Sequence, residues 1–170
     1  MQKYFILGLI LLFPLAAAAN EPPAKPNRLA LRAGLGAPLG LVGLEYGRQV
    51  TDQLSLCGGV GMNTKTPQFA GTARFSHGFG RLEAGVGLGM SVGGMQSYEE
   101  VTSADPVERG TDLGLFGNAE VFFRWHFSRV FVGLFAGGSR LVVELLEPDD
   151  TSWPVQETVF FGGFELGLSF

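Results

Sequence analysis

Apolar residues alternate with small or polar residues along much of the chain, and the alternation has a period of two. Between residues 81 and 93, the even positions are all apolar, whereas the odd ones hold glycine, serine and two charged residues. A helix would scatter these two sets around its circumference, but a strand sorts them onto opposite faces. Residues 160–170 repeat the pattern. The alternation therefore predicts β-strands with one apolar face and one small or polar face.

The same parity recurs in eight segments, which we interpret as strands. They are residues 28–37, 41–49, 54–63, 68–76, 81–93, 112–127, 130–145 and 158–170. Each is long enough for a tilted membrane strand of about 9–11 residues, whereas strands of soluble proteins usually have about 5–6. In the seventh segment the parity is ambiguous, and a bulge at Gly137-Gly138 is one way for its faces to switch.

The connections between these segments differ in length at the two ends. The tight connections, which we assign to the periplasmic side, are residues 50–53, 77–80 and 128–129. The opposite connections are residues 38–40, 64–67, 94–111 and 146–157, and the last two are long. Short turns at one end and long loops at the other are typical of outer-membrane barrels. We therefore predict an all-β fold, an eight-stranded antiparallel up-and-down transmembrane β-barrel, over residues 28–170.

Charged residues fall on the strand face opposite the apolar one. Hydrocarbon does not solvate charge, so the apolar face is expected to meet lipid and the charged face to line the lumen. The expected lumen charges are four arginines and four glutamates: Arg32, Glu45, Arg74, Glu83, Glu120, Arg124, Arg140 and Glu165. An eight-stranded barrel is just wide enough for side chains to fill. We expect these groups to pair and plug the lumen, with Arg74 pairing Glu83; a conducting path or proton relay is the alternative.

The N-terminal segment has the three parts of a secretory signal peptide. Lys3 precedes an apolar run that ends near Pro14, and Ala16–Ala19 offers small residues for cleavage. We assign residues 1–19 to the signal and the proline-containing residues 20–27 to a flexible lead-in. The single cysteine excludes an intramolecular disulfide, and the net charge of −4 argues against a nucleic-acid partner. No cofactor and no metal site are expected.

The last predicted strand carries a pattern of apolar residues that is similar to a known sequence signal. Phe164, Leu166 and Leu168 alternate up to Phe170, and this resembles the C-terminal assembly signal of bacterial outer-membrane barrels. The resemblance implies handling by the barrel-assembly machinery and residence in the outer membrane, among its lipid and lipopolysaccharide. The eight-strand pattern also resembles the small-barrel families typified by OmpX, the OmpA membrane domain and the opacity-type proteins. That architecture hosts many activities, so the resemblance assigns none.

Candidate catalytic residues are sparse. His126-Phe127-Ser128 superficially resembles the His-x-Ser motif of outer-membrane lipid A deacylases, with Glu120 or Glu165 as the acid. That family places its motif near the last strand, whereas here the motif spans a strand end and a turn. We therefore expect no catalytic residue and no enzyme. His77-Gly78 is expected to serve a turn, and Cys57 to pack as a small inward residue.

Acidic residues concentrate in the two long connections. Residues 96–112 contain five acids and one base, and residues 144–157 contain five acids and no base. Carboxylate oxygens bind hard cations, so Glu147, Asp149 and Asp150 are candidate ligands for a divalent cation or contacts for a basic partner; solvated loops are the alternative. The predicted function is a structural or surface-interaction role through these loops, with no ligand specified. A narrow pore or small-solute carrier is the first alternative, and a lipid A-modifying hydrolase the second.

Overall fold

The computed structural model of the chain describes residues 27–36, 38–63, 66–95, 112–145 and 158–170. The predicted signal peptide and nearly all of the predicted lead-in lie outside these residues, as do Glu147, Asp149 and Asp150. The strands are β1 (Asn27–Leu35), β2 (Val42–Gln49), β3 (Leu54–Met62), β4 (Pro67–Phe79), β5 (Leu82–Met95), β6 (Asp112–Phe127), β7 (Val130–Glu144) and β8 (Thr158–Ser169). Within the described ranges, no helix is long and apolar enough to cross a membrane.

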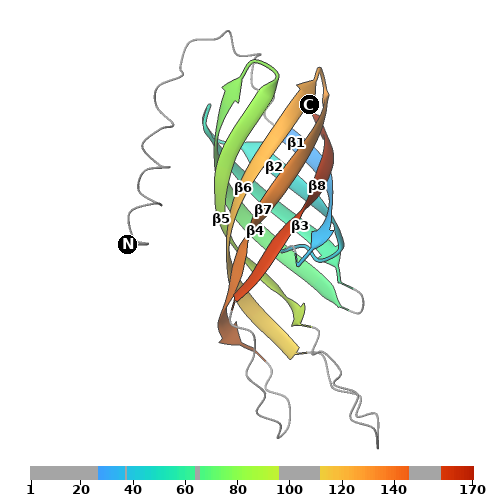
Figure 1. The fold of residues 1–170 in the computed structure, drawn as a ribbon, viewed down its shortest axis with the longest axis vertical. Helices are drawn as coiled ribbons and strands as arrows, with labels where there is room; N and C mark the ends of the chain where they lie inside the picture. The colour runs from blue at the N-terminus through green and yellow to red at the C-terminus, as the bar shows by residue number, and fades with distance from the viewer. Residues whose placement is uncertain (1–26, 37, 64–65, 96–111, 146–157) are drawn as a thin grey trace, which may run out of the picture.

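Each strand pairs antiparallel with its neighbours in sequence, and β8 pairs with β1 (Figure 1). The sheet therefore closes on itself and leaves no free edge along the shared height of the wall. The predicted fold class, a closed eight-stranded antiparallel barrel, is confirmed.

The alternation in the sequence becomes an alternation of burial. In β2, Gly43, Glu45 and Gly47 are buried, whereas the intervening large apolar residues are exposed. The same reversal of the usual soluble arrangement holds around most of the barrel: large apolar side chains mostly point outward, and charged side chains are buried inside together with a few phenylalanine rings. The core of this molecule is therefore a polar lumen enclosed by an apolar exterior.

The two ends of the barrel differ. The tight β4–β5 and β6–β7 turns lie at the end where the chain reaches Phe170, and the long connections leave from the opposite end (Figure 1). On that side β5, β6 and β7, with 14, 16 and 15 residues, extend beyond the shorter β1, β2 and β3. We call these the short-turn end and the long-loop end.

The register of the β4–β5 hairpin differs from the prediction. His77 and Gly78, expected in a turn, continue β4 and pair with Ala84 and Glu83. The turn lies at positions 80 and 81, where Gly80 has a φ of 66°. Turn position fixes hairpin register, so Arg74 lies opposite Gly87 and not near Glu83. The end of β4 consists mostly of polar and small residues, so the alternation of apolar residues does not identify it as part of the strand.

The possible bulge at Gly137-Gly138 is not where the register shifts. The β6–β7 register shifts where Leu115 and Phe116 face Val143 and Leu141, which leaves Val142 as the extra residue. The parity of β7 is therefore unbroken from Phe131 to Arg140. Arg140, predicted to face the lumen, remains on the outer face and is exposed.

Candidate functional site

The lumen brings together seven of the eight predicted charges. They come from six strands, and all are buried: Arg32, Glu45, Arg74, Glu83, Glu120, Arg124 and Glu165. Arg140 is the exception in the predicted set, because the register of β7 places it on the outer face of the barrel. The enclosed charges form two connected clusters.

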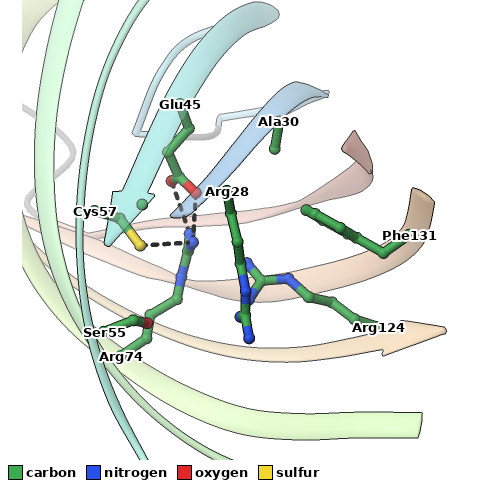
Figure 2. A pocket seen from close by; sticks show the side chains of 9 residues that line it. Arg28, Ala30, Glu45, Ser55, Cys57, Arg74, Arg124 and Phe131 are labelled. Atoms are coloured by element: carbon green, nitrogen blue, oxygen red, sulfur yellow. Dashed lines mark hydrogen bonds and ion pairs between the residues drawn. The ribbon is translucent and has the colours of Figure 1, made fainter. Parts of the chain in front are cut away.

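The central cluster is a ring of two arginines and two glutamates. Arg74 Nε donates to Glu120 Oε1 at 2.5 Å, and Arg74 Nη2 donates to Glu45 Oε2 at 2.8 Å. Arg32 Nη1 and Nη2 donate to the same two carboxylates, Glu45 at 2.9 Å and Glu120 at 2.8 Å. Each carboxylate therefore bridges both guanidinium groups. Figure 2 shows Arg74 directed at Glu45, with Cys57 beside its terminal nitrogen.

The second cluster lies nearer the short-turn end. Arg124 Nε donates to Glu165 Oε1 at 2.5 Å, and Arg124 Nη1 lies 3.5 Å from Glu83 Oε1. Arg28 Nη1 donates to that Glu83 oxygen at 2.8 Å, while His126 Nε2 lies 2.8 Å from Glu83 Oε2. Glu83 therefore contacts three basic side chains. The predicted Arg74–Glu83 pair is wrong, because Arg74 belongs to the central cluster and Glu83 to the second one.

Phenylalanine rings cover the guanidinium groups. The Cζ atom of Arg32 lies 3.8 Å from the ring centre of Phe135. Arg124 lies 4.5 Å from the ring centre of Phe122 and 5.2 Å from that of Phe131. Cations over aromatic faces are attracted by the ring quadrupole, and more strongly where water is excluded. The rings thus stabilise the buried arginines and fill the space beside them.

Little space remains next to the network. A cavity between Arg28, Cys57, Arg74 and Arg124 has a volume of about 10 Å³. A single water needs about 10–15 Å³ on this measure, so the cavity accommodates one water at most. The lumen at this depth is a packed interior rather than an aqueous channel.

A residue of the β1–β2 connection packs into the lumen toward the long-loop end. Leu39, between β1 and β2, is only 2% exposed. A Cβ atom placed on the inward-facing Gly43 or Gly59 would lie 2.6 Å or 2.9 Å from its side-chain atoms. Leu41 N donates to Met62 O at 2.9 Å and holds the connection against β3. These glycines therefore leave the room that Leu39 occupies.

Sequence reasoning missed both Leu39 and Arg28 as lumen residues. Arg28 shares the parity of Arg32 on β1, which was a usable signal at the edge of the predicted strand. For Leu39 the available signal was indirect: inward glycines at neighbouring positions of β2 and β3 mark a place where something else fills the lumen. An alternating pattern predicts strands, and it gives no information about a connection that folds into the lumen.

The other residues that the sequence singled out, Cys57, His126 and Ser128, do not form a common site. Cys57 Sγ accepts a hydrogen bond from Arg74 Nη1 at 3.2 Å, and His126 contacts Glu83. Ser128 lies exposed in the β6–β7 turn with a φ of 61°. In the part of the chain that the structure describes, no group of three or more histidine, cysteine or acidic residues is arranged to hold a metal ion.

The residues of the predicted assembly signal lie on the outer face of β8. Phe164, Leu166, Leu168 and Phe170 are all exposed. The backbone of Phe170 exchanges two hydrogen bonds with Asn27, at 2.9 and 3.1 Å. This segment therefore closes the barrel against β1 and presents an apolar ridge outward.

The fold matches the N-terminal β-barrel domain of Pseudomonas aeruginosa OprF, known from a crystal structure. The TM-score is 0.60 with 13% sequence identity, over 86% of this chain and 98% of that chain. The expected similarity to small eight-stranded barrels is confirmed at the level of the fold. No protein-family model and no curated protein sequence matches the chain.

The central ring predicts a large effect of removing one charge. Replacing Arg74 by methionine leaves Glu45 and Glu120 with half of their buried partners, and breaking a buried pair costs about 3–5 kcal/mol. We expect the free energy of unfolding, measured by urea titration in lipid vesicles, to fall by that order. The matched control is Arg129→Met in the exposed β6–β7 turn, where we expect a change within about 0.5 kcal/mol.

A double-mutant cycle distinguishes the observed pairing from the predicted one. Arg74→Met combined with Glu45→Gln is expected to show a coupling energy above about 1 kcal/mol, because the two groups are in contact. Arg74→Met combined with Glu83→Gln is expected to be additive within about 0.5 kcal/mol. Equal coupling in the two cycles would contradict the two-cluster arrangement.

Proposed function

We propose that this protein is an integral protein of the bacterial outer membrane, in which a sealed barrel supports a structural or surface-interaction role. The observation that carries the proposal is the combination of an apolar exterior with a lumen filled by paired charges. Each half of that observation argues against a different alternative: the exterior against a soluble protein, and the filled lumen against an open channel.

The exterior favours lipid surroundings. Every strand exposes large apolar side chains around the barrel, among them Leu31, Leu44, Leu88, Phe123 and Leu134. Soluble monomers rarely expose contiguous apolar patches above a few hundred Å². A closed barrel also pairs its backbone groups within the wall, which is what hydrocarbon requires. The outer membrane is favoured because β-barrels with unequal ends are typical of that membrane.

Exposed aromatic side chains at both ends of the barrel support its placement across a membrane. Tyr46, Trp125, Phe127 and Phe170 are exposed toward the short-turn end, and Phe69 and Phe160 toward the long-loop end. Amphipathic and aromatic rings are enriched where a barrel crosses the two headgroup regions. We propose that the short-turn end faces the periplasm and the long-loop end the exterior.

The filled lumen favours support over transport. The two charge clusters, the phenylalanine rings that cover their arginines, and Leu39 fill the lumen, and the cavity beside Arg74 has a volume of about 10 Å³. The surface role is assigned to the connections 96–111 and 146–157, whose acidic composition suits divalent cations or a basic partner. We include Glu147, Asp149 and Asp150 in that proposal on composition alone.

A narrow pore is the second candidate. Arg32 Nε and Arg124 Nη1 are buried nitrogen atoms without a hydrogen-bond partner. They lie 3.8 Å from Glu165 and 3.5 Å from Glu83, so each arginine has one more carboxylate in reach than those to which it donates. Exchange of partners within the lumen would open a polar path without unfolding the wall.

The membrane assignment predicts behaviour in cells and on gels. We expect the protein in the outer-membrane fraction, resistant to carbonate extraction, because its exterior is apolar on all sides. Unheated samples are expected to migrate differently from boiled ones on a detergent gel, since a closed barrel resists unfolding. Recovery in the soluble periplasm would contradict the proposal.

The sealed lumen predicts an absence of channels. In planar bilayers at neutral pH, purified wild-type protein is expected to give no stable unitary conductance, because the ring of Arg32, Arg74, Glu45 and Glu120 blocks the path. Boiled protein serves as the control for detergent artefacts. Reproducible unitary steps from the folded protein alone would favour the pore over the sealed support.

A further inference from the structure

The outer face of the barrel is hollowed across β8. The hollow is a wide, open depression with a volume of about 700 Å³, and it lies mainly over the outward faces of β1, β6, β7 and β8. All residues that line it are aliphatic, aromatic or glycine, so it offers no polar side chain to a ligand. Its chemistry therefore selects an apolar occupant.

Small residues form the floor of the hollow, and large side chains bound it. Ala136 of β7 and Leu35 of β1 face Gly162 of β8 from either side. A Cβ atom on Gly162 would have its nearest neighbour at 3.5 Å, an ordinary van der Waals contact, so this position has room for a side chain that it does not carry. Phe123 of β6 and Phe164 of β8 line the hollow and are 53% and 69% exposed, so their rings bound it.

A single cation lies on the same outer face, toward the long-loop end. Of the outward-facing strand residues in that half whose side chains the structure describes, Arg140 is the one that carries a charge. It follows Ala136 by four residues on β7, about 13 Å at a rise of about 3.3 Å per residue. Arg140 also interacts within the protein, and a guanidinium has five N–H donors. At this height it would lie among lipid headgroups, where a phosphate is a suitable further acceptor.

We propose that the hollow binds one acyl chain of a phosphorylated glycolipid of the outer leaflet, of the lipid A class, with its phosphate at Arg140. The inference rests on the proposed function, which places the long-loop end at the outer leaflet. Apolar lining below and a cation above match a lipid that carries acyl chains below and phosphate above. A concave face bounded by projecting rings fits a flexible acyl chain better than the convex wall of a second barrel.

The test uses the full folded protein in detergent and native mass spectrometry, with diphosphoryl lipid A and its dephosphorylated form as probes. Wild-type protein is expected to retain one diphosphoryl lipid A, and to bind the dephosphorylated form about tenfold more weakly, as expected for loss of a charge-assisted contact. Arg140→Gln is expected to bring both lipids to the weaker level. Ala136→Phe, which fills the hollow, is expected to weaken both lipids at least tenfold.

The matched control is Ala73→Phe, which adds the same ring to another exposed, outward-facing alanine, on β4. It is expected to bind as the wild type does. Gly162→Val is a second variant that fills the hollow, and each variant is first shown to be folded by its migration when unheated.

Three results would overturn the inference. Equal binding by Ala136→Phe and Ala73→Phe would show that the hollow is not the site. Equal retention of both lipids by the wild type would remove the role of Arg140. Protein dimers that disappear in Ala136→Phe would assign the hollow to a second copy. If the protein is a folded membrane barrel and these results appear, only the inference fails; recovery from the soluble periplasm would overturn the proposed function as well.

Discussion

The ring in which Arg32 and Arg74 share Glu45 and Glu120 is the interaction on which the rest of the structure depends. Its four side chains come from β1, β2, β4 and β6, so it ties the wall together across the lumen. Charges enclosed in this way are costly unless they are paired. The pairing therefore requires the strands that carry them to hold one register.

The glycine content follows from the size of these side chains. A Cβ atom on Gly87 would lie 2.9 Å from Glu120 Cγ, and one on Gly133 would lie 2.7 Å from Glu165 Oε1. A narrow barrel that encloses arginine, glutamate and phenylalanine has no room for side chains at the positions opposite them. The 26 glycines of the chain are therefore partly a consequence of the filled lumen.

The sequence predicted the wall of this barrel better than its contacts. Period-two alternation identified the strands and the inward face, because one face meets an apolar medium and the other does not. It did not identify the Arg74–Glu45 pair, since pairing across a lumen depends on register and tilt. The Gly80 turn moved Arg74 away from Glu83, and the unbroken parity of β7 up to the bulge at Val142 left Arg140 outside. Leu39 was missed because it belongs to a connection rather than a strand.

The central claim is that the lumen charges are paired and shielded from water, and arginine side-chain NMR tests it most directly. In the folded protein, the Nε–H protons of Arg74 and Arg124 donate to Glu120 and Glu165. We predict two resolved signals that exchange slowly with water at neutral pH, each lost on replacing its own glutamate by glutamine. Rapid exchange at the rate of free arginine would show an open, hydrated lumen and would contradict the account.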